Sequence, residues 1–157
     1  MPNIEQVIVT TLVVKLFLQD KGKWLFLAQT TQNGGKYSLV GGKIESEEVA
    51  TAALIRESAE EAGILLDTKN LSLAFVMFQL KDKNRRIVTL YFKADKWKGD
   101  LESKEPKKFK RVNWFAVEDL PKNISDNTKL ALKSYLKGIT FAETPLKANT
   151  KKAAQKI

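Results

Sequence analysis

The chain has 157 residues, of which 43% are hydrophobic and 29% are charged, and its formal net charge at pH 7 is +9. A chain of this length and composition is typical of one soluble globular domain. It contains no histidine and no cysteine, which excludes disulfides, a zinc site built on these residues, a histidine general base and a cysteine nucleophile.

The first predicted element is a strand over residues 7–18, an apolar run interrupted by Lys15. The run follows Glu5 instead of a basic segment and has no small-residue cleavage site, so it does not match a secretory leader. It is also too short to span a bilayer. Residues 23–29 are again rich in β-forming side chains, and residues 20–22 have the composition of a turn. We therefore expect the two strands to form a hairpin.

A helix is predicted over residues 47–62, after a short strand over residues 37–40 and a pair of glycines at 41–42. Ser46 suits the N-cap position, and Gly63 is a typical residue at the end of a helix. One stripe of this helix is apolar, because its side chains recur at intervals of three and four residues. These side chains are Ala52, Ile55, Ala59 and Ala62.

Three glutamates, Glu57, Glu60 and Glu61, fall within one turn on the opposite side of the helix. They occupy its last turns, where the helix dipole favours cations, and like charges four residues apart repel each other. A cation should therefore compensate them. Ligands that are all oxygens suit Mg²⁺, with Mn²⁺ as a substitute. The alternative is a solvated face of glutamates without a metal.

The second half of the chain is predicted to contain further strands and a last helix. The strands cover residues 71–80, 86–94 and 109–117, with a polar turn and a polar loop between them. The helix begins at Ser125 or Asp126 and ends near Leu136. The chain beyond it is basic and lacks apolar periodicity, so we expect a domain over residues 1–138 and a mobile basic tail over residues 139–157.

The glycine pair and the glutamate-rich helix together resemble the signature sequence of the Nudix hydrolase family. The fixed glycine and charged positions of that signature match at Gly42, Glu48, Arg56, Glu57, Glu60, Glu61 and Gly63. Ser58 departs from it, since this place is usually apolar in the family. The segment before the glycines departs as well, because family members often read Trp-x-x-Pro-Gly-Gly and this chain reads Tyr-Ser-Leu-Val-Gly-Gly.

The resemblance covers about residues 7–136 and implies an α/β fold of the Nudix type. This fold is an α/β/α sandwich with a mixed central sheet and a catalytic box that forms a loop, a helix and a loop. The order of the predicted elements favours the same class, because strands that surround one helix and precede another suit a mixed sheet flanked by helices.

The resemblance also implies which residues form the site. Glu57, Glu60 and Glu61 would be catalytic and would bind the metal. The backbone carbonyl of Gly41 would be a further metal ligand, because a glycine lets the main chain approach closely. Family members often add a carboxylate from a distal loop, as a metal ligand or as a general base, and Glu105 is the catalytic candidate here.

Other side chains have supporting or binding roles in this interpretation. Arg56 is expected to orient a carboxylate. Glu48 is expected to have a structural role or to contact the metal ligands without binding the metal itself. Glu102 is the next candidate for the distal carboxylate. The aromatic side chains that could stack on a base are Tyr37, Phe78, Tyr91 and Trp114, although core packing is the more frequent role of such residues.

The resemblance predicts a Mg²⁺-dependent hydrolase that cleaves a phosphoanhydride bond in a nucleoside di- or triphosphate by attack of water at phosphorus. Oxidised nucleotides are among the expected substrates. Nucleotide sugars and dinucleoside polyphosphates are the alternative substrates. A non-catalytic nucleotide-binding module of the same family is a further alternative, which the retained glutamates disfavour.

The expected partner is a nucleotide-type small molecule. Acidic residues concentrate at positions 43–61 while the rest of the chain is basic, which suits a metal-bound polyanion. The glycine and aromatic motifs of single-strand binders are missing, so no specific nucleic acid is expected. No membrane partner is predicted, and a homodimer stays open. The missing cysteines and leader favour a cytoplasmic location.

Overall fold

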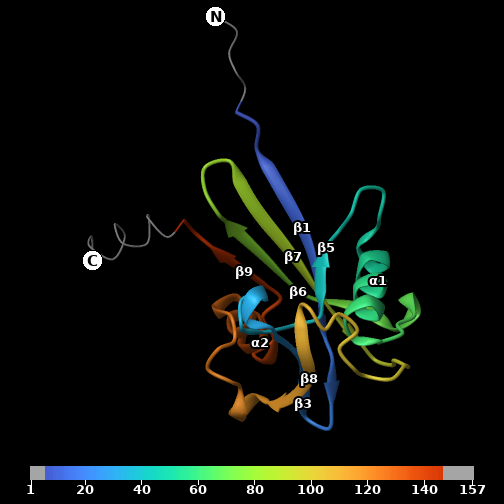
Figure 1. The fold of residues 1–157 in the computed structure, drawn as a ribbon. Helices are drawn as coiled ribbons and strands as arrows, with labels where there is room; N and C mark the ends of the chain where they lie inside the picture. The colour runs from blue at the N-terminus through green and yellow to red at the C-terminus, as the bar shows by residue number, and fades with distance from the viewer. Residues whose placement is uncertain (1–5, 147–157) are drawn as a thin grey trace, which may run out of the picture.

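A computed structural model of the protein describes residues 6–146. Figure 1 shows its strands and helices along the chain. In order they are β1 (Val9–Phe17), β2 (Gln19–Asp20), β3 (Lys23–Gln29), η1 (Thr31–Asn33), β4 (Tyr37–Ser38), β5 (Gly41–Lys43), α1 (Ala50–Ala62), η2 (Thr68–Asn70), β6 (Leu71–Leu80), β7 (Arg85–Ala94), β8 (Phe109–Ala116), η3 (Val117–Asp119), α2 (Asp126–Leu136) and β9 (Phe141–Thr144).

The strands form two sheets. The larger sheet has five strands in the order β5-β1-β7-β6-β9. It is mixed, because β1 runs parallel to β7 and β9 runs parallel to β6, whereas the β1–β5 and β6–β7 pairs are antiparallel. In the smaller sheet β3 pairs with β2, β4 and β8. The predicted mixed sheet is therefore confirmed.

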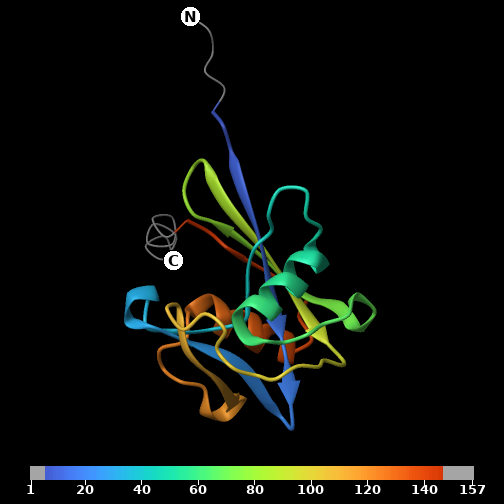
Figure 2. The same ribbon diagram turned by 45° about the vertical axis from the view of Figure 1, so that its right-hand side comes forward.

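The five-stranded sheet lies between α1 and α2, as Figures 1 and 2 show. Successive side chains of a strand point to opposite faces of a sheet, so Leu16 and Phe17 of β1 enter two different cores. The first core contains Leu54 of α1, and the second contains Leu132 of α2. The structure thus has the predicted α/β/α sandwich, with α1 on one side of the sheet and the glycine pair in its edge strand β5.

Most predicted elements are confirmed within one or two residues, but α1 begins at Ala50 and not at residue 47. Val49, rather than Ser46, precedes the helix and makes no side-chain cap. The predicted start is wrong because Glu47 has a φ of 65°, in the left-handed region. The Glu48 carboxylate also accepts a hydrogen bond from the Glu45 N–H at 3.1 Å, which closes a turn in place of the first helical turn.

The predicted hairpin of residues 7–18 with residues 23–29 is confirmed only beside its turn. There the short strand β2 pairs with β3 through Gln19 and Trp24, and the Leu25 N–H donates to the Leu18 carbonyl at 3.0 Å. β1 instead pairs with β5 and β7 in the other sheet. A strand whose side chains are buried on both faces is typical of the interior of a sheet, where another strand pairs with each of its edges. The sequence pattern of the strand does not identify those neighbouring strands.

The folded part continues past the predicted domain end at residue 138. β9 pairs in parallel with β6, with Phe141 opposite Val76, and the Val76 N–H donates to the Thr140 carbonyl at 2.9 Å. The strand has only four residues, too few for a clear period. Residues 147–157, the rest of the predicted tail, lie outside the described residues. Across residues 6–146, no helix is long and apolar enough to cross a membrane.

Candidate active site

The last turn of α1 is joined to β5 by a buried hydrogen bond. The N–H of Gly41 donates to Oε1 of Glu61 at 2.8 Å, and the Glu61 side chain is 5% exposed. Gly41 has a φ of 144°, and a Cβ added there would lie 2.0 Å from the carbonyl oxygen of Val14. Only glycine fits this backbone against β1, so the first glycine of the pair sets the position of Glu61.

Burial is the main cause that raises the pKa of Glu61 to about 7. The charges of Glu57 and Glu105 act in the same direction, whereas the hydrogen bond from Gly41 and the charge of Lys15 oppose it. Since the charged form is the costly one in this surrounding, a cation beside this carboxylate would stabilise it.

The second glycine leaves room for another helix glutamate. A Cβ added to Gly42 would lie 2.5 Å from Oε1 of Glu57 and 2.7 Å from its carboxylate carbon. Any larger residue would therefore have to displace that carboxylate. The glycine pair and the glutamates of α1 thus form one packed unit, in which the β1 backbone leaves no room for a side chain at Gly41 and the Glu57 carboxylate leaves none at Gly42.

Arg56 connects the acidic side chains of the site. Its Nε and Nη2 atoms donate to the two carboxylate oxygens of Glu48 at 2.8 and 3.0 Å, a bidentate pair that fixes the guanidinium. Its Nη1 atom donates to Glu57 at 3.0 Å and to Glu60 at 3.3 Å. The hydrogen bonds that Glu48 accepts from Arg56 and from the Glu45 N–H lower the pKa of Glu48. Arg56 thus supplies part of the positive charge that the sequence predicts at this end of α1.

Lys15 brings a second positive charge to the site, from the sheet. It pairs in register with Gly41, and its Nζ atom donates to the Leu39 carbonyl at 3.2 Å. Burial lowers the pKa of Lys15, and the charges of Glu61 and Glu57 partly restore it. From the sequence, Lys15 was predicted only to interrupt an apolar run. That it is a single charged residue in an otherwise uncharged strand could have indicated a role in the site.

The loop before β8 packs against the end of α1. The Lys104 N–H donates to the Glu61 carbonyl at 3.0 Å. The Glu105 carboxylate pairs with Nζ of Lys108 at 3.0 Å, and Glu105 is near enough to contribute to the raised pKa of Glu61. Glu102 pairs with Lys104, and its side chain is 62% exposed. Of the two distal candidates, Glu105 is the one beside the helix glutamates.

Two of the aromatic candidates are held by their neighbours. Tyr91 is 4% exposed, stacks on Phe17 at 5.0 Å between ring centroids, and has a pKa raised to about 12 by burial. It is therefore a core side chain in this structure. Phe78 pairs in register with Val88, while Tyr91 pairs with Lys15. Strand alternation consequently places Phe78 on the sheet face opposite to Lys15.

The other two aromatic candidates lie on the smaller sheet. Tyr37 is half-buried, packs edge-on against Phe115 at 5.0 Å, and accepts a hydrogen bond from Nη2 of Arg111 at 3.3 Å. Trp114 packs against the first core. Of the four, Tyr37 combines partial exposure with a polar contact, which leaves it as the candidate for contact with a base.

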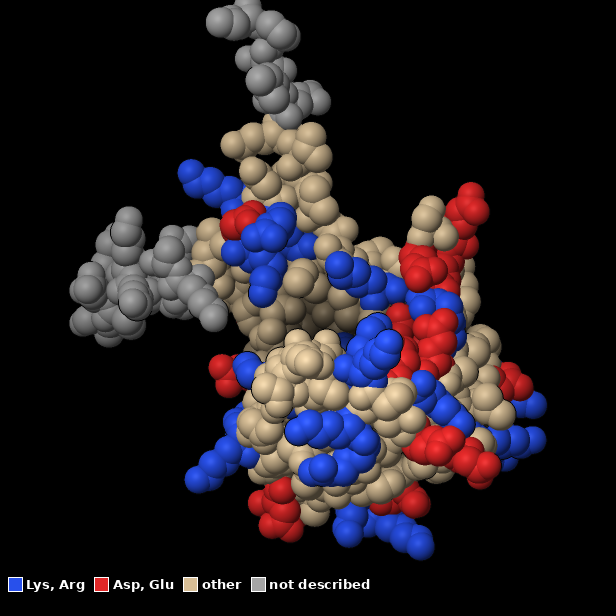
Figure 3. All heavy atoms as spheres, viewed as in Figure 1, with Lys and Arg blue, Asp and Glu red and all other residues tan. Residues whose placement is uncertain are grey.

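The acidic side chains form a patch on a face that is otherwise rich in basic residues. Figure 3 shows acidic side chains gathered beside α1, with basic side chains on both sides of them. No three acidic side chains among the described residues converge on one point as metal ligands, because Glu57 and Glu60 pair with Arg56 and Glu61 binds the Gly41 N–H.

The residues nevertheless fit a hard divalent cation. All the donors are oxygens, the Glu57 carboxylate lies directly above Gly42, and among the described residues the buried Glu61 forms no ion pair. Glu60 is 51% exposed, so its side chain is free to turn.

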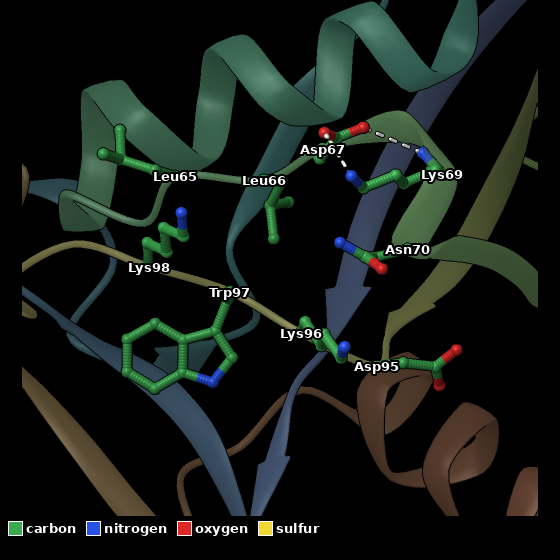
Figure 4. A pocket seen from close by; sticks show the side chains of 9 residues that line it. All are labelled: Leu65, Leu66, Asp67, Lys69, Asn70, Asp95, Lys96, Trp97 and Lys98. Atoms are coloured by element: carbon green, nitrogen blue, oxygen red, sulfur yellow. Dashed lines mark hydrogen bonds and ion pairs between the residues drawn. The ribbon is translucent and has the colours of Figure 1, made fainter.

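A separate hollow of about 640 Å³ lies beyond the C-terminal end of α1. Figure 4 shows Leu66 and Trp97 at this hollow, with the paired side chains of Asp67 and Lys69 beside them. None of the predicted catalytic side chains lines it. The chemistry of the glutamates, and not the size of this hollow, therefore locates the candidate site.

Comparison with known proteins identifies the family of this chain. The family model for the NUDIX domain matches residues 9–135, a range that contains all the residues of the candidate site. The crystal structure of the MutT NUDIX hydrolase from Burkholderia pseudomallei superposes on this chain with a TM-score of 0.71 at 26% identity, and the match covers 80% of this chain and 97% of that one.

The sequence is also similar to proteins of named activity. It is 28% identical over 103 residues to the ADP-ribose pyrophosphatase of Methanocaldococcus jannaschii, and this match covers 66% of this chain and 59% of that protein. It is 30% identical over 88 residues to the oxidized purine nucleoside triphosphate hydrolase of Danio rerio, 55% of this chain and 53% of that protein. It is 35% identical over 89 residues to the 8-oxo-dGTP diphosphatase of Proteus vulgaris, 55% of this chain and 77% of that protein. The matches thus span little more than half the length of the first two relatives.

Proposed function

This chain belongs to the NUDIX domain family, and we propose that it is a Mg²⁺-dependent pyrophosphohydrolase of nucleoside di- and triphosphates, with oxidised purine nucleotides among its substrates. The observation that carries the proposal is the packed unit of glycines, helix glutamates and Arg56 at the end of α1. The relatives named for hydrolysis of oxidised purine nucleotides support the substrate class. A cytoplasmic location is part of the proposal, and a homodimer stays open.

Binding of the cation is the task of the helix glutamates. Glu57, Glu60 and Glu61, with the Gly41 carbonyl, would hold Mg²⁺, which when bound neutralises the charge of the phosphates. Arg56 keeps the carboxylates of Glu57 and Glu60 on one side of the helix. Because Glu48 holds Arg56 at two points, the charge of the guanidinium has a fixed position.

Cleavage requires a positioned water and a place for its proton. The water oxygen attacks phosphorus, the anhydride P–O bond breaks, and the leaving phosphate keeps the electron pair of that bond. In this proposal the Glu105 carboxylate accepts the proton of the water. The Lys108 ammonium pairs with this carboxylate at 3.0 Å and holds it in the loop before β8.

A second candidate substrate is ADP-ribose or another nucleotide sugar. The observation in its favour is the similarity to the archaeal ADP-ribose pyrophosphatase. Dinucleoside polyphosphates and a non-catalytic nucleotide-binding role remain alternatives. All three enzymatic readings use the same glutamates and differ only in the group attached to the phosphates.

A turnover screen tests the proposal. Release of phosphate, pyrophosphate and nucleoside monophosphate is measured with Mg²⁺ or Mn²⁺ over nucleoside triphosphates, oxidised purine nucleotides, nucleotide sugars and dinucleoside polyphosphates. We expect turnover of at least one nucleotide class, reduced about 10²-fold or more in Glu60→Gln. The control Glu118→Gln removes an exposed acid and should act like wild type. No turnover of any substrate, or equal turnover in Glu60→Gln, would contradict the proposal.

A further inference from the structure

Lys15 is the charged residue in the middle of β1, whose sequence is otherwise Val, Thr, Leu and Phe. Its neighbours Val14 and Leu16 are fully buried in the first core. Because side chains alternate along a strand, Lys15 points to the other face of the sheet, where it stands in register between Gly41 of β5 and Tyr91 of β7. This is the face of the sheet opposite to α1, and Lys15 adjoins the site at the edge strand β5, where Gly41 pairs with it and also binds Glu61.

The ammonium of Lys15 has more donors than its protein surroundings use. An ammonium carries three N–H donors. One of them binds the Leu39 carbonyl at 3.2 Å, and within residues 6–146 no carboxylate lies within ion-pair distance of this nitrogen and no second acceptor binds it. Two donors of a half-buried cation are thus left for an acceptor that is not part of the described protein.

A purely structural role explains these contacts less well. A half-buried charge is costly without full pairing, and an apolar side chain would suit the neighbouring core better. Glu61 and Glu57 lie near enough for their charges to act on Lys15, yet neither pairs with it directly. The cation stands beside the proposed metal ligands without neutralising them, which is the position of a group that meets the anion bound there.

We propose that Lys15 is a substrate-binding residue whose ammonium donates hydrogen bonds to a phosphate oxygen of the bound nucleotide. It would contact the phosphates at the edge strand β5, where Gly41 lies between Lys15 and Glu61. The inference rests on the proposed function, because it takes the phosphate chain to lie at this edge of the sheet, beside the helix glutamates. Both the nucleoside monophosphate and the pyrophosphate that hydrolysis yields carry the required chemistry.

Binding measurements with three variants test this assignment. Calorimetry gives the Kd of AMP, GMP and inorganic pyrophosphate, first in EDTA and then in Mg²⁺, for wild type, Lys15→Met and Lys15→Arg. Lys15→Met should weaken at least one probe about tenfold to a hundredfold in EDTA, since a charge-assisted hydrogen bond is lost. Lys15→Arg should keep most of the affinity. The probe that is weakened identifies the phosphate that Lys15 contacts.

The control is Lys93→Met, which removes an exposed lysine from the neighbouring strand β7 and should bind like wild type. In steady-state assays Lys15→Met should raise KM more than it lowers kcat. If Lys15→Met does not fold, Lys15→Gln gives the same comparison without the charge.

Wild-type affinity of a folded Lys15→Met or Lys15→Gln for every probe in EDTA would overturn the inference, even if melting temperature falls, because Lys15 would then only brace Leu39. Absence of probe binding by the wild type in EDTA would overturn it as well. The turnover screen decides the proposed function separately, since an active enzyme with unchanged binding in Lys15→Met refutes this inference alone.

Discussion

The N–H of Gly41 and the carboxylate of Glu61 are joined by a hydrogen bond of 2.8 Å that links an edge strand to the last turn of α1. This bond holds an acid where it is 5% exposed. The environment of Glu61 therefore favours either a proton or a metal cation on its carboxylate. Several measurable properties of the protein depend on which of the two is present.

Without metal, Glu61 should make stability depend on pH. Its pKa is about 7 in the folded protein, above the ordinary value of 4.5. A group with a raised folded pKa contributes stability that is fully present below pH 4.5 and is lost as pH rises to about 7. The loss should be at most roughly 3 kcal/mol. Melting temperatures in EDTA between pH 5 and 8 measure it.

The comparison variant is Glu61→Gln, which has no proton to lose at this position. Its melting temperature should fall less than that of wild type over the same pH range. Equal slopes for the two proteins would show that another group carries the pH dependence.

Mg²⁺ and Mn²⁺ at millimolar concentration should raise the melting temperature at pH 8, because a ligand that binds only the folded state stabilises it. The increase should be largely absent in Glu60→Gln, which removes one carboxylate from the set, and should remain in the exposed-site control Glu118→Gln. Equal melting temperatures of wild type with and without these cations, both alone and with a nucleotide analogue, would contradict the metal assignment.

Ser58→Ala should stabilise the protein by roughly 1 kcal/mol. Ser58 is fully buried in α1, and its hydroxyl has no hydrogen-bond partner among the described residues. Alanine removes this unpaired group and has a higher helix propensity. Urea denaturation of the two proteins measures the difference. A lower midpoint for Ser58→Ala would show that the hydroxyl binds a partner, such as a buried water.

The sequence predicted the glutamates of the site because their spacing is a local property. A helical period places Glu57, Glu60 and Glu61 within one turn wherever the helix packs. The start of α1 could not be predicted in this way. Residues near Ser46 have good capping and helix-forming types, but Glu48 is used to hold Arg56, and this tertiary contact replaces the local preference.

Contacts between distant segments were out of reach for the same reason. The position of Glu105 beside Glu61 depends on a loop that binds the end of α1 through the Lys104 N–H. Lys15 reaches the site only because β1 pairs with β5 rather than with β3. The first fact depends on how a loop packs and the second on strand order, and the periodicity of a single strand contains neither.

Removal of residues 139–157 should destabilise the protein more than removal of residues 147–157. The difference between the two truncated chains includes β9, which pairs with β6 and places Ala142 against the second core. Its loss turns β6 into an exposed edge and should cost roughly 1–3 kcal/mol. Denaturation midpoints of the two chains test this. Equal midpoints would show that β9 contributes nothing to the sheet.

Glu105→Gln should lower turnover about 10²-fold, within the range of general base catalysis. Its carboxylate pairs with Nζ of Lys108 at 3.0 Å, and its charge helps to raise the pKa of Glu61. Glu105 therefore lies at the site although it is not part of α1. Substrate affinity should change far less, because the helix glutamates would still hold the metal and the phosphates.

Glu102→Gln is the matched control for this loop. Its carboxylate pairs with Lys104 and is largely exposed, so its removal should leave turnover near that of wild type. The pH–rate profiles separate the two acids, because a general base works in its ionised form and its protonation produces the acidic limb. Loss of this limb in Glu105→Gln alone identifies Glu105 as the base, and loss in Glu102→Gln alone transfers the role to Glu102. If both variants keep the profile and rate of wild type, neither distal carboxylate takes the proton of the attacking water.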